Sequence, residues 1–417
     1  EKPDAPFVDA LKKLGAEAVL ISKGVPVSAA CFDDHAPRGL VGAALLFAAE
    51  AHEKSSVLIS NGRNCASGKT APGLCVESML YLAYGAAGLE YDLSGYAHEP
   101  MTWYANTYMS ELTLWRPFYQ AYVRYNVDTQ PGGLLPFCGK SVKPEQRSGI
   151  LRAANALAPV GLPMCPGSPW PVCYILNAEA VESMTAVDIQ RVLSGGALLD
   201  GGAVARLQAR GYGSAMQLTA QTREPNVSEV FTDDELNRNR VGYVWQPEAV
   251  KEETFALYPS NEAARVIGRY QRGDGSSAEA ASVLTESASG GRIAAFGFSG
   301  FSPEVSAARR RQLLLAADWV SQGRLPVFVE TVSQVLVVPR VTLAGDLRSV
   351  VALNVTIDEQ PPVTLRLRGC REALETMEWV TPKEKPVALA VRWEGKDALV
   401  TLPAIGPWQI GWLRPAE

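Results

Sequence analysis

Residues 172–213 read VCYILNAEAVESMTAVDIQRVLSGGALLDGGAVARLQARGYG, and this stretch decides the fold. The apolar run at 172–176 predicts a short buried strand, and residues 185–193 have the apolar spacing of an amphipathic helix. A second short strand is predicted at 197–199, and a second helix at 202–210. Strands that alternate with helices form parallel βαβ units, so the stretch predicts a doubly wound, flavodoxin-like α/β domain.

Residues 1–130 show the same alternation of short apolar runs with helix-like segments. The apolar runs lie at 18–21, 25–32, 57–60 and 88–93, and the helix-like segments lie at 39–50, 72–84 and 104–122. Short strands without polar alternation fit a parallel sheet that is buried on both faces. These strands are too few to close an eight-stranded barrel. We therefore expect either an open sheet or part of a β/α barrel whose other units lie upstream or on another chain.

The remainder of the chain divides at changes in composition. Pro, Gly and charged residues crowd residues 131–148, which we interpret as a linker. Residues 149–326 continue the α/β pattern, although 213–287 shows no clear period. From about residue 325 no helical period remains. β-rich runs separated by turn residues predict a small antiparallel β-sandwich over 327–417.

The bulk composition excludes several classes of function. The 417 residues carry 39 basic and 44 acidic side chains, and this net charge of −5 argues against nucleic-acid binding. No apolar run is long enough to span a membrane and no signal peptide is visible, so we expect no membrane contact. Seven cysteines without a C-x-x-C pair favour free thiols and a cytoplasmic location, with a secreted or periplasmic location as the alternative. Because the chain begins with Glu1 rather than Met, we expect an upstream segment.

Polar side chains follow two of the expected strands. Asn61, Arg63 and Asn64 come directly after the run at 57–60, where the carboxyl end of a barrel strand would line an active site. The alternative is a simple turn, because Asn-Gly is a strong turn former. Asp34 and His35 follow an earlier strand and suit acid–base work or binding of sugar hydroxyls. The alternative for these two residues is the N-cap of the next helix.

A third group lies in the strand at 88–93. Glu90 and Asp92 are two residues apart and so share one side of this strand, with Tyr91 between them and Trp103 downstream. Carboxylates beside aromatic rings suit a pyranose, which has apolar C–H faces and a rim of hydroxyls. The alternative is a buried, hydrogen-bonded pair next to ordinary core aromatics.

No cofactor or metal is expected. The three histidines, His35, His52 and His98, are not spaced as a ligand pair. The glycine pairs match neither a P-loop nor a dinucleotide-binding motif, and a G-x-S-x-G nucleophile elbow is absent from the sequence.

Several strings resemble a known family. The run MTAVDIQRVLSGGALLDGGAVARLQARG at 184–211 resembles the glutamine-amidotransferase-like domain that follows the barrel in β-galactosidase-like (clan A) glycoside hydrolases and their uncharacterised bacterial relatives. GGRIAAFG at 290–297 and Asp318-Trp319 resemble the end of the same domain. WRPF at 115–118 resembles the last barrel helix, and Pro407-Trp408 the last strands of the C-terminal sandwich. The resemblance implies the C-terminal part of a barrel at 1–130, an amidotransferase-like domain at 149–326 and a β-sandwich at 327–417.

This resemblance also implies a chemistry and a departure from it. Such barrels have a general acid/base on the fourth strand and a nucleophilic carboxylate on the seventh. If 57–60 is the seventh strand, relatives have a glutamate where this chain has Asn61, and an amide cannot form the glycosyl ester. A fourth strand is not evident in the chain. A carboxylate role would then fall to Asp34, Glu90 or Asp92.

The amidotransferase chemistry of the middle domain is not expected. It needs a cysteine nucleophile with a histidine partner. Cys165 and Cys173 lie near its first strand, but no histidine follows His98. We expect a domain used for packing or for contacts between subunits.

Two functions follow as the main hypotheses, and an unrelated α/β enzyme is the third. The first is a glycoside hydrolase-like protein that acts on a β-galactoside or related saccharide, as a homo-oligomer or with a partner chain that completes the barrel. The second is a non-catalytic carbohydrate-binding or assembly subunit that has lost the nucleophile at Asn61.

Overall fold

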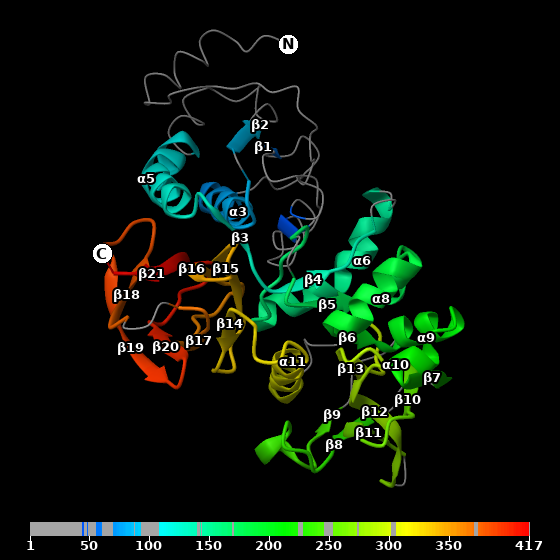
Figure 1. Cartoon of the computed structure of the whole chain (residues 1–417). Helices are drawn as coiled ribbons and strands as arrows, with labels where there is room; N and C mark the ends of the chain where they lie inside the picture. The colour runs from blue at the N-terminus through cyan, green and yellow to red at the C-terminus, as the bar shows by residue number, and fades with distance from the viewer. Residues whose placement is uncertain are drawn as a thin grey trace.

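The structure is a computed structural model (Figure 1). The residues it describes are 44, 45, 48, 56–60, 70–86, 88–92, 108–139, 142, 144–168, 171–223, 228–245, 253–272, 275–301, 306–370 and 374–416. They form a mixed α/β protein with a two-stranded, a ten-stranded and a nine-stranded sheet. None of the helices in these ranges is both long enough and apolar enough to cross a membrane.

The N-terminal part contains one βαβ unit. Strand β1 (Ser56–Ser60), helix α3 (Ala71–Ala83) and strand β2 (Gly88–Asp92) follow one another, and the two strands pair in parallel. Thr70 caps α3, because its hydroxyl accepts a hydrogen bond from Gly73 N at 3.2 Å. Helix α5 (Ser110–Tyr125) packs against α3. These elements confirm the strands expected near 57–60 and 88–93 and the helix expected near 72–84.

The ten-stranded sheet is parallel in one half and antiparallel in the other. The parallel strands are β4 (Leu134–Pro136), β5 (Cys173–Leu176), β6 (Ala197–Asp200) and β13 (Arg292–Phe296). The antiparallel strands are β7 (Leu218–Arg223), β8 (Ser228–Phe231), β9 (Val244–Trp245), β10 (Thr254–Pro259), β11 (Arg265–Gln271) and β12 (Ser277–Glu286). The doubly wound pattern therefore holds for the stretch 172–213 but does not extend through 213–287, which adds the antiparallel half.

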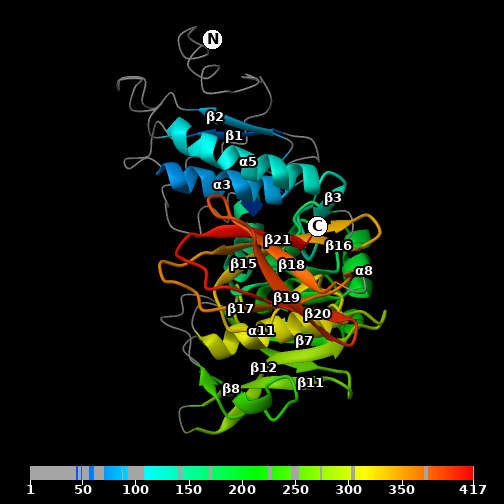
Figure 2. The same cartoon turned by 90° about the vertical axis from the view of Figure 1, so that its left-hand side faces the viewer.

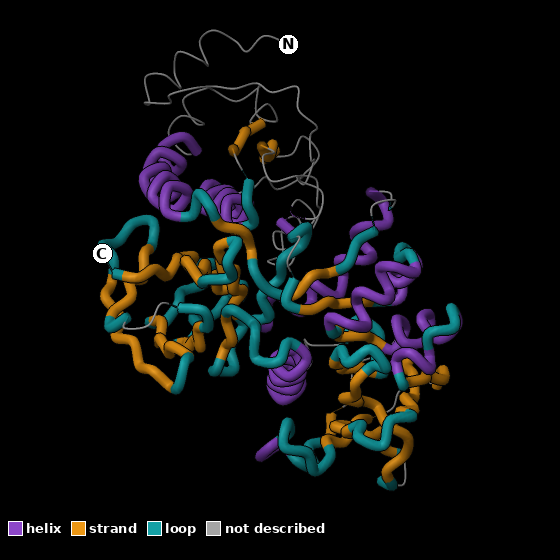
Figure 3. Tube along the Cα trace, viewed as in Figure 1, coloured by secondary structure: helices purple, strands orange, loops and turns teal. Residues whose placement is uncertain are grey.

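Helices flank the parallel half of this sheet (Figure 3). They are α6 (Pro144–Leu157), α7 (Ala178–Glu182), α8 (Ala186–Gly195), α9 (Gly201–Ala209), α10 (Gly213–Met216) and α11 (Ala307–Val320), with a short 3₁₀ turn η3 (Ala158–Val160). A second 3₁₀ turn, η4 (Arg238–Arg240), lies between β8 and β9 of the antiparallel half. A capping box between Thr185 and Asp188 starts α8. Asp200 ends β6 and caps α9, where its carboxylate accepts a hydrogen bond from Ala203 N at 2.7 Å.

The C-terminal part is a nine-stranded antiparallel sheet. Its strands are β3 (Thr129–Pro131), β14 (Val327–Val329), β15 (Val335–Thr342), β16 (Leu347–Asn354), β17 (Val363–Leu367), β18 (Thr376–Val380), β19 (Val387–Glu394), β20 (Asp397–Leu402) and β21 (Ile410–Pro415). Val327 of β14, Val350 of β16 and Val400 of β20 belong to one buried cluster, so strands from both ends of the sheet share a core. The sheet therefore folds over on itself.

The segment interpreted as a linker contributes to both large sheets. Strand β3 pairs with β15 at the edge of the nine-stranded sheet, and β4 pairs with β5 at the edge of the ten-stranded sheet. Only Gly132 and Gly133 separate these two strands. A Cβ atom at Gly133 would lie 2.3 Å from the carbonyl oxygen of Pro163, and its φ is 140°. Glycine is required here because the chain crosses between the sheets in a space that no side chain fits.

The N-terminal part rests on the nine-stranded sheet (Figure 2). Tyr122 of α5 meets Trp412 of β21 edge to face, with ring centroids 5.5 Å apart. The buried guanidinium of Arg340 on β15 donates to the carbonyl of Ala83 at 3.0 Å and to the hydroxyl of Thr129 at 2.9 Å. Arg340 thus connects the end of α3 to β3 and β15 of the nine-stranded sheet.

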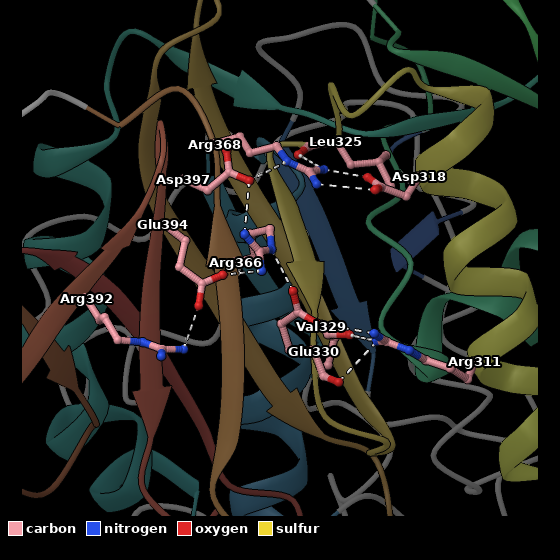
Figure 4. Close-up of polar contacts among 10 residues, drawn as sticks. All are labelled: Arg311, Asp318, Leu325, Val329, Glu330, Arg366, Arg368, Arg392, Glu394 and Asp397. Carbon is pink, nitrogen blue, oxygen red and sulfur yellow. Dashed lines mark hydrogen bonds and ion pairs between the residues drawn. The ribbon is translucent and has the colours of Figure 1, made fainter. Parts of the chain in front are cut away.

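Helix α11 lies between the two large sheets (Figure 1). It packs against β6 and β13 on one side and contacts β14 on the other. A chain of ion pairs joins it to the nine-stranded sheet (Figure 4). Arg311 of α11 and Arg366 of β17 share Glu330, with N–O distances of 3.2 and 2.6 Å, and Arg368 pairs with Asp318 of α11.

Candidate functional site

The carboxyl ends of β1 and β2 lie side by side. Ser60 is the register partner of Asp92, and Leu58 is the register partner of Glu90. In a parallel βαβ unit such neighbouring carboxyl ends form the edge at which ligands bind. The sequence continues from Ser60 directly into Asn61. Two of the three strand ends that the sequence singled out are therefore adjacent in the fold.

The predicted site residues divide into two groups. Glu90, Tyr91 and Asp92 lie in β2, whose backbone position is described. Outside the described residues lie Asp34, His35, Asn61, Arg63, Asn64 and Trp103. The structure thus places β2 beside β1 and does not test the positions of the other six residues.

Helix α3, which joins the two strands, holds a buried carboxylate that the sequence analysis missed. Glu77 is 1% exposed and accepts a hydrogen bond from the Tyr81 hydroxyl at 3.2 Å. Burial raises the pKa of Tyr81, and the neighbouring Glu77 raises it further, so the phenol stays protonated as the donor. Two residues before Glu77, the carbonyl of Cys75 accepts from the Tyr119 hydroxyl of α5 at 2.8 Å, and burial raises the pKa of the Cys75 thiol to about 12. A glutamate within the apolar run LCVESMLYLA was the available sequence signal.

A second buried charge pair lies far from this edge. Arg309 of α11 and Glu229 of β8 are both fully buried, with Nη1 and Oε2 3.3 Å apart. The same Nη1 donates to Gln312 Oε1 at 2.6 Å and to Ser282 Oγ at 3.2 Å. The guanidinium also lies 4.5 Å from the ring centroid of Phe296. Burial raises the pKa of Glu229, and the charge of Arg309 opposes this rise.

This buried pair depends on a glycine. A Cβ atom on Gly268 would lie 1.7 Å from Glu229 Oε1, so the carboxylate occupies the space that a side chain on β11 would fill. Because both charged groups are enclosed, no substrate can reach them. The pair joins α11 to the antiparallel half of the sheet and fixes the packing between them.

Two cysteines that flank the first strand of the α/β region are also enclosed. Cys165 and Cys173 are both 0% exposed, and burial raises the pKa of each thiol. A thiol that stays protonated is a poor nucleophile. Neither cysteine can therefore serve an amidotransferase-type reaction in this conformation.

The described ranges contain no cluster of three or more histidine, cysteine, aspartate or glutamate side chains placed to hold a metal ion. The three histidines of the sequence lie outside those ranges. The described part of the chain therefore offers carboxylates and hydrogen-bonding groups as its chemical functions.

Comparisons with known proteins relate this fold to glycoside hydrolases. The chain is similar in structure to α-L-fucosidase isoenzyme 2 from Paenibacillus thiaminolyticus, with 12% identity and a TM-score of 0.56 over 87% of this chain and 60% of that protein. It is also similar to β-galactosidase from the psychrophilic Marinomonas ef1, with 10% identity and a TM-score of 0.52 over 91% of this chain and 56% of that protein. The chain therefore spans less than two thirds of the length of either protein.

No family model matches the sequence, and no curated protein matches it. At these identities the structural similarities establish a glycoside hydrolase-like fold and nothing finer. The activity of this chain has to be argued from its own residues.

Proposed function

We propose that the chain is part of a glycoside hydrolase-like protein that acts on a β-galactoside or a related saccharide. The proposed active site lies at the edge formed by the carboxyl ends of β1 and β2. The remaining barrel strands would come from sequence outside residues 1–417 or from a partner chain. The middle part would then be the amidotransferase-like domain of the resemblance, which serves packing or contacts between subunits.

The observation that carries this proposal is the register of the two strands. Parallel pairing sets Ser60 opposite Asp92, so the polar segment that follows Ser60 and the carboxylates of β2 come from neighbouring strand ends. Hydrolysis of a glycosidic bond requires two carboxyl groups or their equivalents at such an edge. We assign these roles to Glu90 and Asp92, with Asp34 as the third candidate. His35, Asn61, Arg63, Asn64, Tyr91 and Trp103 would contact the sugar.

The proposal predicts turnover that depends on β2. Full-length protein should hydrolyse at least one of nitrophenyl β-D-galactoside and nitrophenyl α-L-fucoside. Glu90→Gln or Asp92→Asn should lower kcat/KM by about 100-fold or more, because general acid–base groups contribute about that much. The matched control is Asp358→Asn, which removes an exposed carboxylate from the loop between β16 and β17. Folded protein that cleaves neither substrate would count against a hydrolase.

Asn61 favours a second candidate function, a carbohydrate-binding or assembly subunit without hydrolysis. An amide at the place where the resemblance implies a nucleophilic carboxylate would leave sugar binding intact and remove glycosyl-ester formation. Calorimetry should then detect saccharide binding without turnover, and Asn61→Glu should restore hydrolysis. The control Asn239→Glu adds the same charge at an exposed position in η4. Activity in the unsubstituted protein would exclude this candidate.

A further inference from the structure

A polar cleft lies at the C-terminal end of α11, and none of the residues that line it belongs to the proposed active site. It has a volume of about 800 Å³ and opens between the last turn of α11 and the loop that follows β8. Leu236 and Leu315 lie in its wall together with charged side chains and one tryptophan. This volume lies within the range of small-molecule sites in proteins.

The charges around the cleft are already largely matched. Arg265 forms two hydrogen bonds with the carboxylate of Asp234, at 2.9 and 2.6 Å, and pairs with Glu235 at 2.9 Å. Asp318 is held by two hydrogen bonds from Arg368, which reaches it from the nine-stranded sheet (Figure 4). Either an anion or a cation in the cleft would meet like charges that are fixed in place. A neutral ligand with many hydroxyls can instead donate to the carboxylates and accept from the arginines.

Trp319 gives the cleft an aromatic wall. Its side chain is partly exposed, and the guanidinium of Arg292 lies 4.9 Å from the centre of its ring. Arg292 also donates to the carbonyl of Trp319 at 3.0 Å, which fixes both groups. An aromatic ring with hydrogen-bonding groups around it combines apolar contact with polar contact, as a sugar ring requires.

Two residues in the wall hold a backbone conformation that disfavours their side chains. Arg238 has a φ of 48° and Gln322 has a φ of 56°. Gln322 directly follows the C-cap of α11, where glycine is the usual residue because it adopts this conformation without strain. Each non-glycine residue in this region costs about 1 kcal/mol.

Packing within the protein does not account for these two side chains. Both residues are exposed, and within the described part of the chain neither side chain forms a hydrogen bond or an ion pair. The described chain has five non-glycine residues with positive φ, and two of them line this one cleft. Their shared position suggests a use at the cleft itself.

We propose that this cleft is a binding site for a short neutral saccharide, which packs on Trp319 and is hydrogen-bonded by Arg238, Gln322 and Asp318. The site is independent of the edge formed by β1 and β2, and it does not require the chain to be an enzyme. In a protein that degrades polysaccharide, this cleft would bind the polysaccharide at a second position, separate from the active site.

Glycine substitutions test the proposal without disturbing the fold. Arg238→Gly and Gln322→Gly remove the polar side chain and relieve the backbone strain, so the midpoint of urea unfolding should stay the same or rise. The matched control is Gln217→Gly, because Gln217 has a φ of 55° at the end of α10, outside the cleft. The probes are lactose, cellobiose and L-fucose, titrated into full-length protein by calorimetry.

We expect at least one probe to bind, with an affinity at least tenfold weaker in Arg238→Gly and in Gln322→Gly and unchanged in Gln217→Gly. Asp358→Asn should not affect this binding, because Asp358 is exposed and lies outside the cleft. Absence of binding for all three probes would overturn the inference. Binding that survives both cleft substitutions would place the sugar elsewhere and would also overturn it, while leaving the proposed function intact. Preferential binding of inorganic phosphate would show an anion site and would contradict a neutral ligand.

Discussion

At the scale of single residues, the interior of this protein depends on a few exact fits between backbone and side chain. The carboxylate of Glu229 lies where a Cβ atom on Gly268 would be, and Arg309 reaches that carboxylate from α11. The ion pair therefore exists only because a strand residue has no side chain. Such a fit is invisible in the sequence, where Gly268 looks like any glycine inside a strand.

We predict that Gly268→Ala lowers the free energy of unfolding by about 3 kcal/mol, because the new methyl group must displace a buried carboxylate that has no other space. Urea denaturation followed by circular dichroism measures the loss. Gly149→Ala is the matched control, since a Cβ atom there makes only ordinary contacts with the Glu179 side chain, at 3.7 and 3.9 Å, and alanine favours the helix α6. Equal stability of the two variants would contradict the fit described for Gly268.

We predict that Arg309→Met costs about 3–5 kcal/mol at neutral pH, because it leaves the buried Glu229 without its counter-charge. The pKa of Glu229, already raised by burial, rises further without Arg309. The folded variant then binds a proton more readily than the unfolded chain, so its stability falls as the pH rises above about 4.5. Unfolding curves between pH 4.5 and 8 measure this slope.

The double variant Glu229→Gln with Arg309→Met serves as the control for that slope. It removes the ionisable group, so the dependence on pH should disappear. If the stability of the single variant Arg309→Met does not change between pH 4.5 and 8, Glu229 does not become an unpaired buried charge. That result would contradict the prediction.

At the scale of elements, the helices and strands are held to one another by arginines. Arg340 links the end of α3 to β3 through Ala83 and Thr129, and Arg366 links β17 to β19 and β20 through Glu394 and Asp397. These contacts join segments far apart in the sequence. Their loss should loosen particular elements before it unfolds the whole chain.

We predict that Arg340→Met lowers stability by about 2–3 kcal/mol and speeds amide hydrogen exchange in residues 71–86. The methionine fills the space but leaves the carbonyl of Ala83 and the oxygens of Thr129 without their buried donor. Hydrogen exchange read by mass spectrometry detects the local loosening. Arg348→Met is the control, because Arg348 is exposed and lies over the ring of Tyr125. Loosening of 71–86 in both variants would argue against a specific clamp.

We predict that the ion pairs of Glu330 stabilise the junction above pH 4.5 and weaken in acid. Burial alone would raise the pKa of Glu330, but hydrogen bonds and charge from Arg366 and Arg311 outweigh it and lower this pKa. The stability that Glu330 contributes is therefore lost as the pH falls below about 4.5. Glu330→Gln should cost about 1 kcal/mol at pH 7 and progressively less below pH 4. Glu286→Gln, which removes a more exposed partner of Arg292, should change stability by less at every pH.

The sequence predicted those elements in which apolar residues follow a regular helical or strand pattern. The βα run from β5 to α9 has short apolar strands and a well-capped amphipathic helix, and the structure confirms these elements. Strand β12 was not predicted, because SAEAASVLTE is rich in alanine and its buried residues do not alternate with exposed ones. Its strand conformation follows from its pairing with β11 and β13. This pairing forms in the folded sheet and leaves no local pattern in the sequence of β12.

The candidate site could be predicted only in part. The neighbouring positions of β1 and β2 follow from the βαβ pattern, because parallel strands joined by one helix commonly pair. The cleft beside α11 could not be predicted, since its wall combines the end of one helix with the loop after β8 and with Arg265 of β11. No local pattern records that these three segments meet. The positive φ of Arg238 is likewise a property of the folded chain.

At the scale of the whole molecule, one of the hydrophobic clusters joins the parts of the protein to one another. A single buried cluster includes residues of α3, α5, α11, β6 and β21. The main chain reinforces this union, because β3 belongs to the nine-stranded sheet although it precedes the entire α/β region. The boundaries that the composition suggested therefore divide the sequence, but the segments on either side of them pack against one another in the fold.

We predict that a chain beginning at residue 132 associates with itself or aggregates. Removing β3 exposes the edge of β15, whose residues at 335–341 are buried in the intact protein. An open and apolar strand edge pairs readily with another chain. Size-exclusion chromatography with light scattering compares it with the full-length protein. Stable monomers of the shortened chain would show that β3 is dispensable.

The two-residue crossing at Gly132 and Gly133 bears on how such a protein can arise. A gene segment cut near residue 326 would deliver the last sheet without its border strand, and a segment cut near residue 132 would lose the same strand. Recombination can therefore transfer this architecture intact only if residues 129–416 travel together. The α/β region and the C-terminal sheet look like separable domains in the sequence, but we expect them to have been inherited together.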